Sequence, residues 1–296
     1  MTTHSAQVSL ADTTSQSRKL RDVGFLIALW ISLLLALLTL ATLVVTTFLD
    51  GAPMLNRDFL TFFPSPFPED SGIQSALFGS IWVTVTSGIV SLVFALGTAI
   101  YLEEFANSNS RLQRLIGLNI QTLAGVPSIV YGILGLAFVV RSPLNWGFTV
   151  GSAAATLTMM VLPIMIVATR EALKAVPPSL REGSYALGAT RWQTVYRQVL
   201  PASVPGIATG SILGVSRALG ESAPLILLGA LAYVSYNPTG FDSDFTVLPL
   251  LIFKWSTEVQ EEFRPLAAAG IIVLLAVLFA LNLLAIIIRD RSRVKW

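Results

Sequence analysis

An arginine and a glutamate stand in an apolar stretch where a membrane helix is expected to carry no charge. Arg217 and Glu221 are four residues apart, so a continuous helix would place both on one face. A charge at the centre of a bilayer costs about 2.5–3.5 kcal/mol on insertion scales, so such residues usually have a function. The planar guanidinium offers paired donors that suit the oxygens of an anion, and the carboxylate could hold it in place.

A ridge of small residues precedes this pair and predicts which way the charges face. The ridge spreads over about 120° of helix surface, at about 100° per residue, and consists of Gly206, Gly210, Gly214 and Ala218. Arg217 and Glu221 fall within that arc. Small residues at this spacing form close-packing faces between helices, so we expect the charges to point into the protein or a partner rather than into lipid. Two interpretations stay open: a mutually neutralising pair that sets the register between helices, or an anion-handling site on a translocation path.

The composition is that of a membrane protein. Of 296 residues, 54% are hydrophobic and 12% are charged, and the mean hydropathy is +0.72, whereas an average soluble domain carries about 25% charged residues. The formal net charge of +2 suggests no nucleic-acid partner. The chain has no cysteine and one histidine, His4, which excludes disulfides, His-based triads and most zinc sites, and no cofactor is expected. It also lacks a Gly-x-x-x-x-Gly-Lys-[Ser/Thr] loop, so we do not expect it to hydrolyse ATP itself.

Six apolar stretches predict an all-α polytopic protein with six transmembrane helices. Their approximate ranges are 24–49, 73–102, 118–140, 147–169, 202–234 and 265–288. The third contains Gly125-Val-Pro-Ser, where the proline breaks the helix, so Ser128 and Tyr131 become candidates for lining a path. The fifth is longer than the roughly 20 residues that span a bilayer. Because it also contains Pro205 and Pro224, we expect it to be kinked or broken.

The segments between the predicted spans are polar. We expect residues 1–22 to be a mostly disordered tail and not a cleavable signal, because the apolar run that follows is too long for one. The loops 50–72 and 235–264 are expected on the outside, and the prolines of the first exclude a helix there. Glu103 and Glu104, which end the second span, are expected to be a solvated helix end.

Basic residues are distributed unevenly between the two sides of the predicted topology. Four segments fall on one side of the predicted membrane, and they contain fourteen of the 19 lysines and arginines. They are residues 1–22, 103–117, 170–200 and 289–296. Cytoplasmic loops carry such an excess of lysine and arginine. The sequence therefore predicts that both termini and the 170–200 loop are cytoplasmic.

The long cytoplasmic segment predicts a helix–turn–helix. Ser179 is a plausible N-cap, and Glu182 would complete a capping box. Gly188 is expected to end the first helix, as glycine at the C′ position commonly does, and a second short helix is expected over about 190–199, with Trp192 near its start. Two interpretations stay open: an interfacial element that rests on membrane lipid, or a docking element for another protein.

The pattern of this segment resembles the EAA loop of ABC-importer permeases. The matching residues are Glu182, Ala186 and Gly188, followed by Leu200-Pro201, whereas the expected alanine after the glutamate is Gly183 here. The resemblance implies a coupling-helix loop, at 170–201, that inserts into a groove on an ATPase subunit. The residues it assigns to this contact are Glu182, Ala186, Gly188, Ala189 and Trp192.

Further motifs resemble the permeases of the phosphate-specific transport system, and the PstA family more than its PstC paralogues. These motifs are Ala99-Ile-Tyr-Leu-Glu-Glu-Phe, Gly125-Val-Pro-Ser-Ile-Val-Tyr-Gly, Arg217-Ala-Leu-Gly-Glu and Gly220-Glu-Ser-Ala-Pro. The resemblance implies a non-catalytic subunit of a prokaryotic plasma (inner) membrane importer with a MetI-like core. It also implies the segments 1–22 (cytoplasmic tail), 23–72 (first span and external loop), 73–288 (permease core) and 289–296 (cytoplasmic tail).

The same resemblance implies partners and a substrate. The partners would be a second permease (PstC-like), an ATPase dimer (PstB-like) and an extracytoplasmic phosphate-binding protein (PstS-like). Inorganic phosphate would then pass Arg217, Glu221, Ser128 and Tyr131, and Glu221 could accept the proton of hydrogen phosphate, which sulfate lacks. The alternatives are a permease for another oxyanion or polar solute, and a membrane scaffold or signalling subunit that does not transport.

The predicted topology can be tested with single cysteines, because the chain has none of its own. We expect a cysteine at Thr190 to react with an impermeant thiol reagent only from the cytoplasm, and one at Ser243 only from outside. Labelling in intact cells and in inverted vesicles measures this. Labelling of both positions from the same side would contradict the six-span topology.

Overall fold

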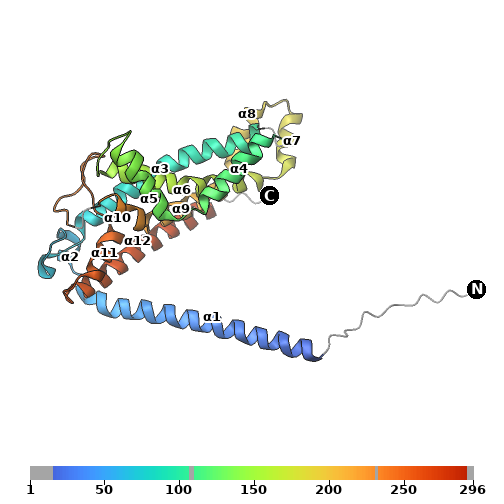
Figure 1. Cartoon of the computed structure of the whole chain (residues 1–296). Helices are drawn as coiled ribbons and strands as arrows, with labels where there is room; N and C mark the ends of the chain where they lie inside the picture. Colours follow the sequence, from blue (N-terminus) through green and yellow to red (C-terminus); the bar gives the residue numbers. More distant parts are fainter. Residues whose placement is uncertain (1–15, 107–109, 231–232, 292–296) are drawn as a thin grey trace, which may run out of the picture. The chain divides into compact units, whose positions relative to one another are not determined.

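The computed structural model describes residues 16–106, 110–230 and 233–291, and these residues form helices and loops without a strand (Figure 1). The α-helices are α1 (Gln16–Gly51), α2 (Arg57–Thr61), α3 (Gln74–Ile100), α4 (Arg111–Ala124), α5 (Ser128–Leu134), α6 (Val150–Lys174), α7 (Pro178–Ala186), α8 (Arg191–Thr194), α9 (Leu200–Leu219), α10 (Ala223–Leu227), α11 (Leu248–Thr257) and α12 (Phe263–Arg291). Short 3₁₀ turns, η1 (Ala52–Met54) and η2 (Pro68–Asp70), and wider π segments, η3 (Tyr101–Phe105), η4 (Gly135–Arg141) and η5 (Val195–Val199), complete the described helical structure.

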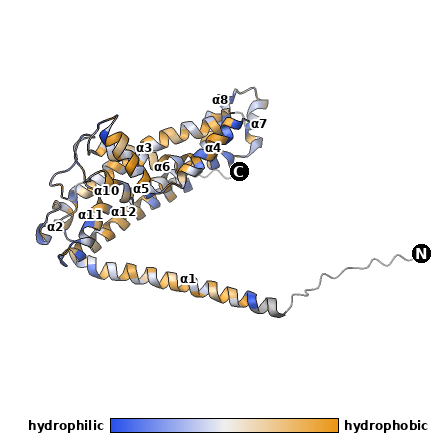
Figure 2. Cartoon of the chain, in the orientation of Figure 1, coloured by the Kyte–Doolittle hydropathy of each residue, from blue (hydrophilic) through white to orange (hydrophobic). Residues whose placement is uncertain are grey.

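Within the described residues, five helices are long and apolar enough to cross a membrane, and one bent pair makes a sixth candidate if it is counted as one span. The long helices are Arg21–Met54, Gln74–Phe105, Val150–Lys174, Arg191–Leu219 and Phe263–Arg291. The pair is Arg111–Ala124 with Ser128–Arg141, bent by 102°. Hydrophobic residues predominate along these helices in Figure 2. The predicted all-α membrane fold, with a break at Gly125–Pro127 in the third span, is therefore confirmed.

The segment up to Leu49 is a unit of its own, distinct from Asp50–Trp296. Most of it is helix α1, whose span is apolar around its circumference and is exposed over residues 21–46. The hydroxyls of three threonines donate to backbone carbonyls one turn earlier, at 2.8–2.9 Å; they are Thr39, Thr42 and Thr46. The helix begins at Gln16 because no glycine or proline stops it before the span, so the expected disordered tail was wrong for residues 16–22. Residues 1–15 lie outside the described part.

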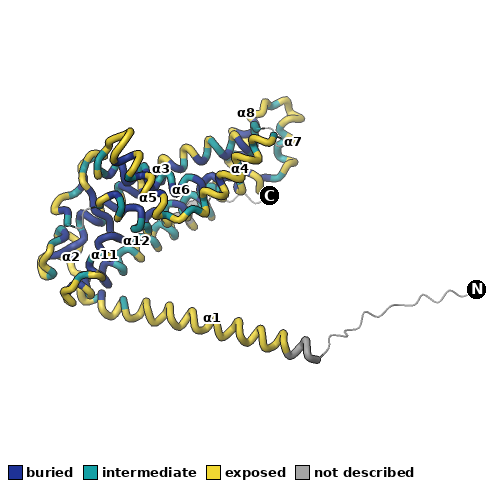
Figure 3. The backbone as a smooth tube through the Cα atoms, in the orientation of Figure 1, coloured by how far each residue is buried: buried dark blue, intermediate teal, exposed yellow. Residues whose placement is uncertain are grey.

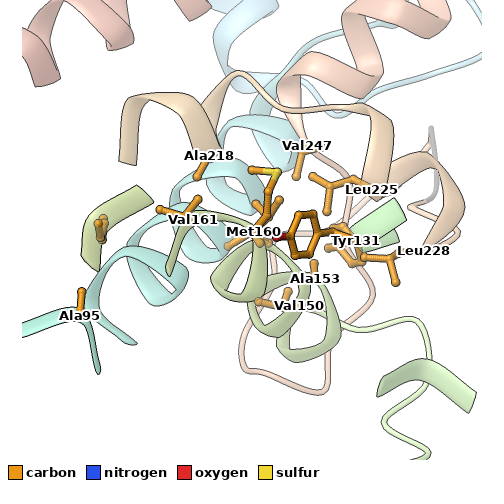
Figure 4. Packing of buried hydrophobic residues seen from close by; sticks show 14 of the residues in the cluster. Ala95, Tyr131, Val150, Ala153, Met160, Val161, Ala218, Leu225, Leu228 and Val247 are labelled. Carbon is orange, nitrogen blue, oxygen red and sulfur yellow. The ribbon is translucent and has the colours of Figure 1, made fainter. Parts of the chain in front are cut away.

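The second unit is built around α6, which packs along both α3 and α9. Many residues of α6 are buried, and the tube is dark blue there in Figure 3; Figure 4 shows the side chains of Met160 and Val161 of α6 in this core. The predicted ridge of small residues on α9 is the contact face. A Cβ on Gly206 or Gly210 would lie 2.7 or 2.5 Å from the Cβ of an alanine on α6, and one on Gly214 would lie 2.8 Å from the Cε of Met165. Glycine is needed there because the two backbones approach so closely.

Both loops that were predicted to be external contain helices that were not predicted. Residues 50–72 hold η1, α2 and η2, and residues 235–264 hold α11, whose Trp255 is fully buried against Phe263 of α12. Proline did not prevent these helices because it occupies their first turn, at Pro53, Pro68 and Pro249. The first turn lacks an intrahelical acceptor for its N–H groups, so a missing N–H costs nothing there.

Two span boundaries also differ from the prediction. The third span begins at Arg111 in place of residue 118, so Arg111 and Arg114 belong to α4 and not to a loop. The fifth is a continuous helix from Arg191 to Leu219 that tolerates Pro205 and breaks at Gly220. A break in this span was expected at one of its prolines. It lies at Gly220–Ser222, just before Pro224, and α10 begins directly after it.

The α6–α9 contact makes a direct prediction for stability. Gly210→Ala would bring two Cβ atoms within 2.5 Å, so the helices must separate, and overpacking of this kind costs about 1–3 kcal/mol. We expect a lower midpoint of thermal unfolding for the purified protein in detergent. The matched control is Gly97→Ala on α3, where a Cβ meets nothing within 4 Å. Equal midpoints for the two variants would contradict the close packing.

Candidate functional site

Two interrupted spans meet inside the second unit. The third span is broken at Gly125–Pro127 and the fifth at Gly220–Ser222, and the short helices that follow the breaks, α5 and α10, pack against each other. At their contact, a Cβ on Gly132 would lie 2.7 Å from the Cα of Pro224. Non-helical backbone at membrane depth is tolerated where it is buried in protein or lines a water-filled cavity. Paired breaks of this kind are also the usual position of a transporter's binding site.

Tyr131 joins the two sides of the first break. Its ring is buried among the side chains of α6 and α10, including Met160 and Leu225 (Figure 4). Its hydroxyl donates a 2.8 Å hydrogen bond to the backbone carbonyl of Leu123, in the last turn of α4. That carbonyl also accepts from the N–H of Val126 at 3.1 Å, so the hydroxyl adds a second bond to one of the last carbonyls of the helix. Tyr131 therefore has a structural task at the break, while Ser128, the first residue of α5, is half-buried.

Arg217 and Glu221 do not lie on one helix. Helix α9 ends at Leu219 with Gly220 as its C-cap, so the four-residue spacing no longer places the two side chains on the same face. Within the described residues, neither charge has an ion pair within 4 Å. The interpretation of a mutually neutralising pair within this chain is therefore wrong, and the reason is the helix end between them.

Arg217 is exposed on the surface of the second unit, whereas Gly214 and Ala218 on the same helix are buried. It follows Leu213, whose side chain is 61% exposed, by one turn. It lies in the last turn of α9, where a cation is favoured by the helix dipole, and close enough to the Tyr131 hydroxyl to act on it electrostatically. The small residues of α9 thus pack on α6, and Arg217 lies outside that contact. It is near Tyr131, which follows the break in the third span, and three residues before the break in the fifth.

The segment between α6 and α9 has the expected turn but different caps. Helix α7 ends in a Schellman motif: Gly188 has φ +82°, its N–H donates to Tyr185, and the N–H of Ala189 donates to Ser184. The predicted cap of Ser179 with Glu182 is wrong, because α7 starts at Pro178 and no side chain caps it. A capping box does occur at the next helix, formed by Thr190 and Gln193.

The second predicted helix of this segment is the beginning of the fifth span. Helix α8 continues through the π segment η5 into α9, so the prediction of an independent helix over 190–199 was wrong. The apolar side chains at the tip of the segment face away from the protein: Leu187 is 90% exposed and Trp192 is 59% exposed. Glu182, Ala186 and Gly188 are exposed as well, and Ala189 is half-buried.

The glutamates at the end of the second span are not solvated. Glu103 pairs with Arg170 of α6 at 2.6 Å, and Glu104 pairs with Arg181 of α7 at 2.7 Å. The Glu104 side chain is only 6% exposed. The sequence did contain a signal for these pairs. Two acids end the second predicted span, and Arg170 and Arg181 lie early in the segment 170–200.

A cavity of about 660 Å³ lies between α3 and α6, away from these residues. It is lined largely by apolar and hydroxyl side chains, including Thr86, Trp146 and Thr158, and Asp242 contributes a carboxylate. None of the predicted site residues lines it. A carboxylate without a neighbouring cation repels an anion, so this cavity does not compete with Arg217 as an anion site.

Comparisons with known proteins agree with this fold. Residues 91–294 match the family of binding-protein-dependent transport system inner membrane components. The chain is 32% identical over 218 residues to the phosphate transport system permease protein PstA 1 of Mycobacterium tuberculosis (74% of this chain, 70% of the relative). It is 31% identical over 255 residues to PstA of Yersinia pestis (84% and 82%). The inward-facing MetNI methionine ABC transporter contains a chain of the same fold, with a TM-score of 0.62 at 17% identity (74% of this chain, 95% of that chain).

Proposed function

The chain belongs to the family of binding-protein-dependent transport system inner membrane components, and on that premise we propose that it is the PstA-type permease subunit of an ATP-driven importer of inorganic phosphate. It forms half of the translocation path in the plasma membrane of a prokaryote, with both termini in the cytoplasm. Permeases of this family are not catalytic, so a separate ATPase subunit hydrolyses the ATP. Residues 73–288 are the permease core, which contains most of the matched region.

The position of Arg217 carries the proposal. It is an exposed guanidinium in an apolar stretch, beside two broken spans, and no carboxylate of the described residues neutralises it. An unpaired cation facing lipid is costly. Arg217 therefore faces a second, PstC-like permease in the complex, and the passing anion neutralises its charge. A guanidinium binds two phosphate oxygens at once, and phosphate is the cargo named for both PstA relatives.

Glu221 and Ser128 are polar residues at the two breaks, and we assign them to the same path as Arg217. Glu221 is half-buried in the second break, and Ser128 begins α5 after the first. The Glu221 carboxylate accepts a hydrogen bond from the proton of hydrogen phosphate, which sulfate lacks. Tyr131 contributes by holding the first break in shape and lies within electrostatic reach of Arg217. This arrangement favours phosphate, while another oxyanion remains the second candidate because a guanidinium recognises any of them.

One continuous helix connects the cytoplasmic tip to the anion site. Arg191–Leu219 is 29 residues long, so Trp192 and Arg217 are about 38 Å apart along it at 1.5 Å per residue. The tip, with Glu182, Ala186, Gly188, Ala189 and Trp192, docks on a PstB-like ATPase dimer. When ATP closes that dimer, the displaced tip tilts the helix, and Arg217 moves relative to the second permease. A PstS-like binding protein supplies phosphate on the opposite face.

The turn at Gly188 supplies a test of the coupling role. Gly188→Val places a β-branched residue at φ +82°, where strain costs about 1–3 kcal/mol, so the tip changes shape while the spans are untouched. We expect ATP-driven phosphate uptake to be lost while the protein still inserts and pairs with the second permease. Uptake by membrane vesicles and co-purification of the subunits measure this.

The matched control is Gly183→Ala in the same segment. Gly183 lies in α7, its φ is not positive, and a Cβ there meets nothing within 4 Å. We expect this variant to transport normally. Normal uptake by Gly188→Val would show that the turn is not needed for coupling.

Anion recognition is tested at Arg217. We expect Arg217→Gln to abolish phosphate uptake with the complex still assembled, and Arg217→Lys to retain a part, because lysine keeps the charge and loses the bidentate fork. The double variant Arg217→Gln, Glu221→Gln should remain inactive, since the two side chains do not neutralise each other in this chain. Uptake of labelled phosphate, with and without excess sulfate, and membrane abundance are measured together. Full transport by the double variant would overturn the proposed site, and competition by sulfate would favour the wider oxyanion assignment.

A further inference from the structure

The cytoplasmic end of α3 is attached through one turn of helix to the segment between α6 and α9. This segment, which contains α7 (Pro178–Ala186) and α8 (Arg191–Thr194), is called the tip segment. This turn is η3 (Tyr101–Phe105), which extends α3 and carries two adjacent glutamates. Glu103 turns to α6, where it pairs with Arg170, and Glu104 turns to α7, where it pairs with Arg181. Both pairs are largely shielded from solvent, with side-chain exposures between 6% and 20%. Shielded charge-assisted bonds of this kind are stronger than exposed ion pairs.

Arg181 binds three pieces of the chain at once. Its Nη1 donates to the carbonyl of Val176 at 2.7 Å, and its Nη2 donates to the carbonyl of Leu173 at 2.9 Å. Its Nε and Nη2 donate to Oε1 of Glu104 at 3.2 and 2.7 Å. The carbonyls belong to the end of α6 and the linker that follows, so they fix the guanidinium within the tip segment. Glu104 is then its one ligand from α3.

An aromatic contact joins the same turn to the other half of the tip. The rings of Phe105 and Trp192 lie with their centroids 6.3 Å apart. Trp192 belongs to α8, while Arg181 belongs to α7, so the end of α3 touches both helices of the tip segment. Trp192 is nonetheless 59% exposed, which leaves its outer face free.

The opposite end of α3 is attached to the outer segment that follows the broken fifth span. The hydroxyl of Ser75 donates to the carbonyl of Val234 at 2.6 Å, and the hydroxyl of Ser80 accepts from the N–H of Leu248 at 2.7 Å. The helix between these attachments is continuous from Gln74 to Phe105. A continuous helix of this length is a stiff connection between the two sides of the membrane.

We propose that Glu104 and Arg181 are positioning residues that make α3 move with the tip segment and so carry its displacement to the outer segment 234–248. The inference rests on the proposed function, in which an ATPase moves the tip. Without this pair the tip keeps its two covalent connections, to α6 and to α9, but its polar attachment to α3 is lost. Movement of the tip then reaches the outer segment less completely.

The test uses Glu104→Ala in the full transporter complex in membrane vesicles. We expect this variant to hydrolyse ATP while the phosphate imported per ATP falls about fivefold or more, the range of typical coupling effects between sites. The matched control is Glu103→Ala, which removes a neighbouring shielded carboxylate whose partner, Arg170, lies on α6. Helix α6 packs along α3 through the core, so the control should leave the ratio unchanged. Equal losses in the two variants, or none in Glu104→Ala, would overturn the proposal.

A second readout does not depend on the cargo. A cysteine at Phe241, which is 53% exposed in the outer segment, is labelled from outside with an impermeant thiol reagent, with and without ATP. We expect ATP to change the labelling rate in the otherwise unaltered complex and in Glu103→Ala, and to change it little in Glu104→Ala. An ATP-dependent change that persists in Glu104→Ala, or that is missing from the unaltered complex, would overturn the proposal. If the unaltered complex shows the labelling change but imports no phosphate, the result overturns the assignment of phosphate as the cargo and leaves the role of Glu104 standing.

A covalent rescue separates attachment from general stability. In a variant with Glu104→Cys and Arg181→Cys, we expect a low phosphate-to-ATP ratio that a bismaleimide cross-linker restores, because the link replaces the ion pair. A cross-link that lowers the ratio further would show that α3 and the tip must slide past each other, and would overturn the proposal.

Discussion

Backbone polar groups inside a bilayer have to be satisfied by the protein, because lipid offers them no partner. This constraint explains why the two broken spans lie together. Their short second halves, α5 and α10, cover each other's backbone at Gly132 and Pro224, and the Tyr131 hydroxyl adds a hydrogen bond to the carbonyl of Leu123 in the last turn of α4. The permease core can therefore hold irregular backbone next to Arg217, where a continuous helix would offer only side chains.

The close packing of α9 on α6 sets the second condition for function. Glycines on α9 bring the two backbones together, so the long helix Arg191–Leu219 rests on a firm support along its middle while its ends remain exposed. One end carries Trp192 and the other carries Arg217. A helix supported in this way is suited to carry movement from one end to the other, as the proposed coupling to a separate ATPase requires. The ion pairs of Glu103 and Glu104 attach the end of α3 to α6 and to α7, respectively.

Much of the fold could be predicted because the signals are local. Apolar stretches predicted six crossings, Gly125-Val-Pro-Ser predicted the break in the third, and Gly188 predicted the end of α7, whose φ of +82° glycine adopts readily. The errors arose where a local rule has a positional exception. Prolines in the outer loops start helices at Pro53 and Pro249, and the helix after Thr190 runs on into the membrane because nothing in η5 stops it.

The sequence by itself determined the membrane class, the crossings, the glycine face of α9 and the presence of a charged pair of residues in an apolar stretch. Only the tertiary structure decided how the charges are used. Arg217 and Glu221 are separated by the end of a helix, while Glu103 and Glu104 find arginines far along the chain. Helical spacing describes neighbours within one continuous helix, whereas ion pairing between helices depends on where each helix ends and what packs beside it, and those distances arise only on folding.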